Sequence, residues 1–177
     1  MEDRILLEMA RGGDEPAFTE VYRRHRDAVF RFAWRMTGAA DTAEDVAHDC
    51  WLAVLAGKAR WVPEQGPLLP FLLGVTRNLA LRRMRYQARE CENEGGEDRP
   101  AADDPLREAM AGEIGAAVAR AVGELPPLQR EALVLFEYEG LTLDEIARVA
   151  AVPVGAVKAR LFRARETLRR KLALVRS

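Results

Sequence analysis

Two groups of arginine and lysine residues are the clearest chemical feature of this sequence. Residues 77–89 contain five Arg and no acid, and residues 153–177 contain eight Lys or Arg and one acid, Glu166. Cations at this density suit phosphate groups, because each one that meets a phosphate releases a condensed counterion. The formal net charge is only −1, but the segregation of charge along the chain predicts two separate surfaces for nucleic acid.

Residues 142–165 have the sequence pattern of a helix-turn-helix. Thr142 and Glu145 predict a capping box that opens a short helix, and Pro153 follows the turn before a longer basic helix. This second helix separates its cations from an apolar stripe that consists of Val157, Leu161, Ala164 and Leu168. In such a motif the second helix enters the major groove, where its early residues meet base edges and its later ones meet phosphates.

The N-terminal half predicts two amphipathic helices. The first is expected to begin after an N-cap at Asp14 and to end at Gly38, with an apolar face made of Phe18, Val21, Tyr22, Val29, Phe32, Ala33 and Met36. The second is expected to open with a capping-box-like arrangement at residues 41–44 and to end at Gly57. Its apolar positions are Val46, Ala47, Cys50, Trp51, Val54 and Leu55.

Proline and glycine divide the rest of the chain. Residues 58–70 contain three Pro and one Gly, which predict an irregular loop. A third helix, broken or bent near Gly74, is expected to run into the first basic group. An Ala-rich helix is expected over residues 106–122, and a helix that begins near Pro127 is expected to end at Gly140.

Composition favours an all-α protein. Hydrophobic residues make up 49% of the chain and charged residues 31%, with few aromatics. We predict two small helical domains, residues 1–88 and 113–177, of which the second is a helix-turn-helix domain. Nine acids and three Arg fall in residues 88–113, so residues 89–112 are predicted to form a flexible acidic linker.

Several classes of protein and site are disfavoured. No run approaches the roughly 18 apolar residues of a membrane span, and the N-terminus lacks the layout of a signal peptide, so a cytoplasmic protein is expected. Cys50 and Cys91 form no CxxC motif and are expected to be reduced thiols, and no third ligand lies near His25 or His48. Without a nucleophile and base set or a phosphate loop, neither an enzyme nor a cofactor or metal is expected.

Three segments resemble one known family. Residues 125–131 (LPPLQRE), 139–147 (EGLTLDEIA) and 152–165 (VPVGAVKARLFRAR) look like the C-terminal domain of extracytoplasmic-function sigma factors. Independently, residues 17–38 and 41–46 resemble the family's first helix and its "DAEDL" polymerase-binding helix, and residues 63–81 resemble its loop and promoter-reading segment. The resemblance covers nearly all of the chain except the linker. It implies a factor that binds core RNA polymerase, directs it to promoter DNA and is controlled by an anti-sigma factor.

The resemblance assigns polymerase binding to the second predicted helix. The residues expected to dock on a coiled coil of the largest polymerase subunit are Asp41, Glu44, Asp45, Asp49, Trp51 and Leu52. An acidic face over an apolar stripe also suits a basic helical partner on physical grounds. The alternative is that the acids complement the helix dipole, which accounts for the first three but not for Asp49.

The first basic group aligns with the segment that reads the minus-ten promoter element. Asn78 stands where the family captures an unstacked base of the non-template strand, and an amide can read such a base edge. Phosphate-facing charge would come from Arg77, Arg82, Arg83 and Arg85. Arg82 departs from the family, which often has Asp there. For Trp61 and Phe71, burial in the core is favoured over base stacking.

The second basic group aligns with the reader of the minus-thirty-five element. The residues nominated are Gly155, Lys158, Ala159, Arg160, Phe162 and Arg163. Ala156 and Ala159 replace the commoner Thr and Ser, and Lys158 replaces a common Arg, which reduces a bidentate guanine contact to a single point. The promoter element that is read can therefore differ from that of other members.

Two other functions are consistent with parts of this pattern. An ordinary helix-turn-helix regulator would have a similar C-terminal half and would bind duplex DNA without polymerase. A sigma-like adaptor that sequesters an anti-sigma factor would need no DNA contact, and the intact basic helix argues against it. The linker could run through polymerase channels that otherwise hold nucleic acid, or it could be a flexible spacer.

Overall fold

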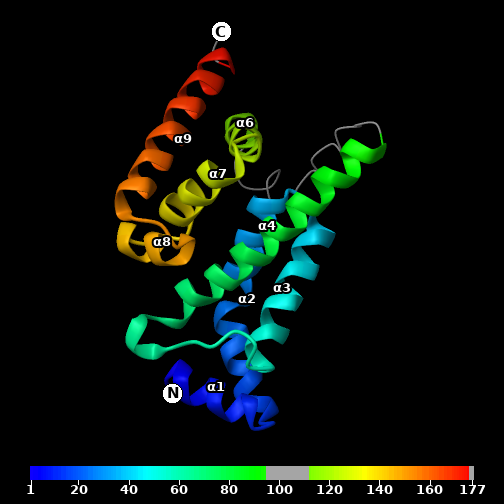
Figure 1. Cartoon of the computed structure of the whole chain (residues 1–177), viewed down its shortest axis with the longest axis vertical. Helices are drawn as coiled ribbons and strands as arrows, with labels where there is room; N and C mark the ends of the chain where they lie inside the picture. The colour runs from blue at the N-terminus through cyan, green and yellow to red at the C-terminus, as the bar shows by residue number, and fades with distance from the viewer. Residues whose placement is uncertain (95–111, 176–177) are drawn as a thin grey trace.

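The computed structural model describes residues 1–94 and 112–175, and every regular element in these ranges is helical (Figure 1). The N-terminal half contains α1 (Asp3–Arg11), α2 (Glu15–Thr37), α3 (Ala40–Leu55), the 3₁₀ turn η1 (Pro63–Gln65) and α4 (Leu68–Glu94). The C-terminal half contains α6 (Gly112–Gly123), α7 (Pro127–Leu133), the π-helical segment η2 (Val134–Tyr138), α8 (Leu143–Ala150) and α9 (Val154–Val175). The predicted all-α class is confirmed.

Helix α4 extends into the predicted linker. The sequence predicts a linker from residue 89, but residues 89–94 continue α4. The rest of the predicted linker, and the start of the helix expected over residues 106–122, lie outside the described residues. The described part of the Ala-rich helix predicted over residues 106–122 is α6, which ends at Gly123, one residue beyond the prediction.

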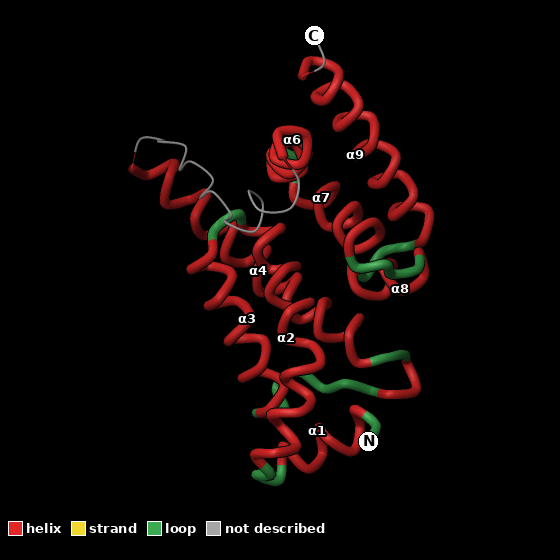
Figure 2. The backbone as a smooth tube through the Cα atoms, turned by 180° about the vertical axis from the view of Figure 1, so that it is seen from behind, coloured by secondary structure: helices red, strands yellow, loops and turns green. Residues whose placement is uncertain are grey.

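Helices α2, α3 and α4 lie side by side, and α1 crosses one end of them (Figure 2). The Oδ1 atom of Asp14 accepts a hydrogen bond from the Ala17 amide at 2.8 Å, and α2 ends at Gly38, whose φ of 74° suits glycine. Both predicted ends of α2 are therefore confirmed. Its buried face comprises Ala17, Val21, Val29, Phe32, Ala33 and Met36.

Two helix starts differ from the prediction. α1 was not predicted, since it is a nine-residue helix without a side-chain cap; it buries Leu6 and Leu7. α3 begins at Ala40, so Asp41 lies inside the first turn and its Oδ1 accepts from the neighbouring Thr42 amide at 2.9 Å. The capping-box-like start predicted at residues 41–44 is wrong, because Ala39 occupies the N-cap position and no side chain caps the helix.

Helix α4 begins inside the predicted loop of residues 58–70 and continues through Gly74. Pro70 lies in its first turn, where a missing N–H costs no intrahelical bond. The helix is continuous at Gly74, so the predicted break is absent, and a bend at this residue stays a prediction. A Cβ atom at Gly74 would lie 3.9 Å from Cγ1 of Val149, so α4 passes close to α8 at this glycine.

The helix-turn-helix is confirmed in detail. Thr142 Oγ1 accepts from the Glu145 amide, and Glu145 Oε1 accepts from the Thr142 amide, each at 3.1 Å. Ala151 takes a left-handed φ of 55° in the turn, and α9 follows at Val154. The predicted stripe of α9 is inside, since Val157, Leu161 and Ala164 are buried.

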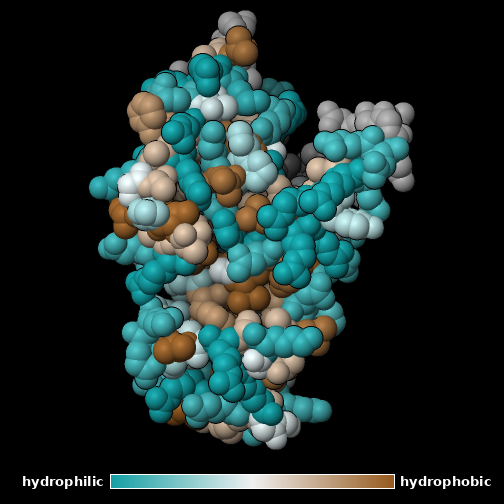
Figure 3. Space-filling view, viewed as in Figure 1, coloured by the Kyte–Doolittle hydropathy of each residue, from teal (hydrophilic) through white to brown (hydrophobic). Residues whose placement is uncertain are grey.

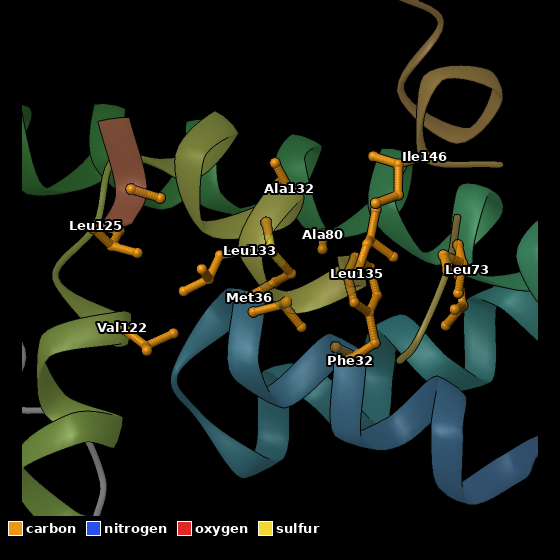
Figure 4. Close-up of a cluster of buried hydrophobic side chains, with 14 of the residues drawn as sticks. Phe32, Met36, Leu73, Ala80, Val122, Leu125, Ala132, Leu133, Leu135 and Ile146 are labelled. Atoms are coloured by element: carbon orange, nitrogen blue, oxygen red, sulfur yellow. The ribbon is translucent and has the colours of Figure 1, made fainter. Parts of the chain in front are cut away.

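The two halves share one hydrophobic core (Figure 4). From the N-terminal half, Phe32 and Met36 of α2 and Leu73 and Ala80 of α4 are buried. They belong to the same cluster as residues of the C-terminal half, which are Val122, Leu125, Ala132, Leu133, Leu135 and Ile146. The sequence predicts two separate domains; in the structure the corresponding halves pack against each other.

The two cysteines should differ sharply in reactivity. Cys50 is fully buried beside Leu72, and burial raises the pKa of its thiol to about 11, whereas Cys91 is exposed on α4. Because the thiolate is the nucleophile, iodoacetamide at pH 8 is expected to modify Cys91 and to spare Cys50 until the protein unfolds. Mass spectrometry of digested protein measures both. Equal modification of Cys50 in the folded Cys91→Ser variant and in its unfolded form would contradict this placement.

Candidate partner and nucleic-acid interfaces

One side of α3 carries an exposed acidic surface. Asp41, Glu44 and Asp45 are exposed, Asp49 is partly exposed, and Leu52 follows with 52% of its surface accessible. We call these five residues the acidic face of α3. An apolar side chain at the end of four carboxylates is an arrangement that suits a cationic protein partner.

Trp51 does not belong to this face. It is 5% exposed and turns into the core, where its ring meets Tyr22 at 5.3 Å and Phe18 at 6.1 Å between centroids, both edge-on. This placement contradicts the predicted docking role of Trp51. Trp51 shares the apolar stripe of α3 with Cys50 and Val54. Because residues of one stripe lie on the same side of a helix, its ring points into the core with theirs.

Helix α4 presents its arginines in two ways. Arg82 and Arg85 are exposed, and hydrophilic residues cover the end of α4 that faces the viewer in Figure 3. Arg83 instead turns toward α3, where its guanidinium lies 3.6 Å from Asp45 and 3.4 Å from Asp49. The acidic face of α3 and the basic side of α4 are therefore neighbours.

Arg77 and Asn78 lie where the two halves meet. Asn78 is exposed, and its Oδ1 accepts from Arg77 Nη1 at 3.2 Å. The Arg77 side chain is only 15% exposed and is paired with Glu131 of α7. The structure thus brings the predicted base reader to the surface but buries the first of its predicted phosphate contacts.

A cavity of about 250 Å³ lies beside Asn78. Trp61 and Phe71 line one side, and Arg148 and Val149 of α8 line the other. Trp61 Nε1 donates to the Gly66 carbonyl at 3.0 Å, and both aromatic rings pack at the edge of the N-terminal core. The predicted burial of these two rings is therefore partial, since each also reaches the cavity.

Helix α9 exposes most of the predicted duplex-reading residues. Lys158 and Arg163 are exposed, as is Phe162 at 66%. A Cβ atom at Gly155 would meet open space, so the helix start is accessible as well. Ala159 is half-buried, and Arg160 turns inward to Glu131, at 3.2 Å from Nη1 to Oε1. Five of the six predicted duplex-reading residues therefore lie at or near one surface of α9, and Arg160 is the exception.

Sequence reasoning missed Glu131. Its fully buried carboxylate pairs with both Arg77 and Arg160. Arg77 lies 54 positions before Glu131 in the sequence, and Arg160 lies 29 positions after it. The available signal was an acid within the apolar run of residues 131–135, which requires a buried partner.

Within residues 1–94 and 112–175 no group of acids, His or Cys is arranged to hold a metal ion, and no helix is long and apolar enough to cross a membrane.

Two family models match separate parts of the chain. The family model for sigma-70 region 2 matches residues 21–90, and that for sigma-70 region 4 matches residues 115–168. The extracytoplasmic-function sigma factor SigM of Mycobacterium tuberculosis is 32% identical over 171 residues, which is 96% of this chain and 84% of the relative. The chain belongs to the extracytoplasmic-function sigma factor family.

Other similar proteins overlap with the chain to different extents. SigE of Mycolicibacterium smegmatis is 34% identical over 162 residues, but the chain spans only 62% of that protein. The solved structure of CnrH with the cytosolic domain of CnrY is 26% identical, with a TM-score of 0.70 over 97% of both chains. RpoE of Bartonella quintana, solved with the anti-sigma factor NepR, shares the fold with a TM-score of 0.76 at 24% identity over 88% of this chain and 96% of RpoE.

Adjacent residues of α3 should separate packing from docking in this sigma factor. Trp51→Ala is expected to lower the free energy of unfolding by about 3–5 kcal/mol, because it empties a buried aromatic site. Leu52→Ala should change it by less than about 0.5 kcal/mol, because the side chain is half-exposed. Urea titrations measure both. Equal destabilisation by the two variants would mean that Leu52 is part of the core.

Proposed function

We propose that this chain binds core RNA polymerase and directs it to promoter DNA without catalysing a reaction itself. The observation that carries the proposal is the sorting of exposed charge among three helices. α3 presents carboxylates, whereas α4 and α9 present Arg and Lys in two parts of the chain that match sigma-70 regions 2 and 4. A protein partner and two nucleic-acid segments fit this arrangement, and a chain with this function acts in the cytoplasm.

The acidic face of α3 is the proposed polymerase contact. Its carboxylates would steer the chain toward a basic helical surface, and Leu52 would be buried on contact. Arg83 neutralises part of this face from the side, but its pairs with Asp45 and Asp49 are partly exposed and longer than 3.2 Å. Such surface pairs contribute little and can exchange for intermolecular ones.

Asn78 and the exposed arginines of α4 are the proposed contacts of melted minus-ten DNA. The Asn78 amide can read a base that has left the stack, and Arg82 and Arg85 can meet phosphates of the same strand. Trp61 and Phe71 give the neighbouring cavity an aromatic wall that suits a planar base.

The exposed face of α9 is the proposed contact of the minus-thirty-five element. Lys158 and Arg163 lie on that face, and Phe162 and the open backbone at Gly155 lie beside them. The early position of these residues in α9 suits base edges in the major groove. With α4 reading one element and α9 the other, duplex anchoring and strand capture are separate tasks of the two halves.

We expect the chain to be held inactive by an anti-sigma factor. One solved relative, CnrH, is bound to the cytosolic domain of a second protein, CnrY, which supports a protein partner for this chain as well. Such a partner could cover the acidic face of α3 as well as the exposed cations of α4 and α9.

Reversing one charge on α3 should break polymerase binding. Asp45→Arg is expected to abolish co-purification with core polymerase and run-off transcription, because it places a cation against a basic partner. The exposed side chain leaves the fold intact. Asp27→Arg, a reversal at an exposed acid of α2, is the matched control and should retain both activities. Co-purification of Asp45→Arg at the level of wild type would rule out the docking face.

Truncation on α9 should change promoter choice. Lys158→Ala and Arg163→Ala are each expected to cost roughly 1–3 kcal/mol of promoter binding if the residue reads a base, with a loss that depends on the base substituted. Run-off transcription over a set of minus-thirty-five variants measures this, with the exposed Arg4→Ala as control. A uniform loss would assign the residue to a phosphate, and unchanged transcription by the double variant would favour the adaptor function.

A further inference from the structure

Tyr86 places a large aromatic ring at the surface of α4. The chain contains three Tyr, and the rings of the other two have partners. The Tyr22 ring lies 5.3 Å from that of Trp51, measured between centroids. The Tyr138 ring lies 4.2 Å from the Arg35 guanidinium. Tyr86 is 62% exposed, and within the described residues its ring meets no other aromatic ring and no guanidinium.

The neighbours of Tyr86 on the helix surface are arginines. Arg82 precedes it by four positions and Arg89 follows it by three, which are the spacings at which side chains of a helix lie next to each other. Asn78 lies four positions before Arg82, and all four residues are exposed. We call Asn78, Arg82, Tyr86 and Arg89 the α4 stripe. Cations beside an aromatic ring are the composition of surfaces that bind single-stranded nucleic acid.

The α4 stripe is open to solvent. Helix α8 comes close to α4 at Gly74, and α7 pairs with it at Arg77, one position before the stripe begins. Gln87 faces α3 instead, where its Nε2 donates to Thr42 Oγ1 at 3.4 Å. The later turns of α4 extend away from α7, α8 and α9 (Figure 1). A DNA strand can therefore run along the whole stripe.

A local contact gives an alternative explanation for Tyr86. Its hydroxyl donates a hydrogen bond to the carboxylate of Glu90, one turn later, and this bond raises the pKa of Tyr86. The bond engages the edge of the ring and leaves its faces free. Because a base stacks on the ring face, the two roles can be separated. Tyr86→Phe removes the hydroxyl and keeps the ring, whereas Tyr86→Leu removes both.

The position of Tyr86 along α4 sets which base it can reach. It follows Asn78 by eight residues, which is about 12 Å at the rise of an α-helix. Successive nucleotides of one strand are spaced by about 3.4 Å. A strand that is captured at Asn78 and follows the cations of the stripe therefore passes Tyr86 after about three to four nucleotides.

We propose that Tyr86 is a further contact of the melted minus-ten strand, on which it stacks a base about three to four nucleotides from the one that Asn78 captures. The inference rests on the proposed function, because it extends the minus-ten surface of α4. Every base has a face on which an aromatic ring can stack, so Tyr86 adds affinity with little choice of base. Asn78 supplies the choice, since its amide reads a base edge. Arg82 and Arg89 hold phosphates on either side of the ring.

Fluorescence of a base analogue tests the stacking directly. Holoenzyme is assembled from core polymerase and the full chain and bound to DNA with a pre-opened minus-ten segment. This segment carries 2-aminopurine at one non-template position at a time, and stacking lowers the fluorescence of the analogue. Quenching by the wild type is expected about three to four nucleotides from the position at which Asn78→Ala changes the signal. Tyr86→Phe should retain this quenching and Tyr86→Leu should lose it. Equal quenching by Tyr86→Leu and the wild type would overturn the stacking.

The salt dependence of binding separates the ring from the charges beside it. One stack between a base and an aromatic ring contributes roughly 1–3 kcal/mol, so Tyr86→Leu holoenzyme is expected to bind the opened DNA about 5- to 150-fold more weakly. The slope of log K against log salt concentration should not change. Arg82→Ala should instead make this slope shallower by about 0.7, because one phosphate contact is lost. Ile114→Ala removes a 79% exposed apolar side chain of α6 and is the control that should bind as the wild type does.

Two results would contradict the role of the ring. Unchanged DNA binding by Tyr86→Leu would rule it out, and equal weakening by Tyr86→Phe and Tyr86→Leu would assign the residue to its bond with Glu90. Co-purification of each variant with core polymerase verifies that it has folded. Unchanged binding by Asn78→Ala and Arg82→Ala would instead overturn the proposed minus-ten function of α4, and quenching by the Tyr86 variants would still decide the stacking.

Discussion

The burial of Glu131 constrains the arrangement of both halves. A carboxylate without solvent access is tolerated only when it is paired and hydrogen-bonded, because its desolvation costs more than a single contact returns. Two guanidiniums meet that requirement here, one from α9 and one from α4. The pair with Arg160 joins α9 to α7, and the pair with Arg77 joins α4 to α7. Each pair turns one arginine, of α4 or of α9, away from solvent.

Local structure was predictable because its causes lie within a few residues. The cap at Asp14, the box formed by Thr142 and Glu145, and the glycine end at Gly38 each depend on neighbours in the sequence. Apolar spacing likewise predicted most of the buried faces of α2 and α9, although Tyr22 of the predicted α2 face is exposed. The short helix α1 was not predicted, because it has neither a side-chain cap nor a long apolar stripe.

The pairing of distant side chains was not predictable from pattern. Arg77 and Arg160 were assigned to DNA from local charge, but Glu131 is 54 and 29 positions away and carries no signal for its partners beyond its apolar surroundings. At Trp51 two sequence signals disagreed. Its aromatic type suited a docking face, whereas its spacing along α3 suited the core. The spacing decided, because burial of a large ring outweighs a partner contact that the free chain lacks. Gly74 predicts a break or a bend in its helix, whereas α4 continues through it and passes close to Val149 of another helix at this point.

The polar atoms between the halves argue that this boundary differs from a permanent core. The Arg130 guanidinium donates to the carbonyls of Met36 and Leu125, and burial lowers its pKa. Burial also raises the pKa of Glu139, which lies 3.6 Å from Arg35 in the other half. Among the residues that the structure describes, Arg130 Nε and Glu139 Oε1 are buried without a hydrogen-bond partner. Such atoms regain hydrogen bonds to water when the halves separate, which offsets part of the cost of exposing the apolar cluster. An interface that combines buried Leu and Phe with incompletely paired charges can close in the free chain and still open when a partner supplies comparable contacts.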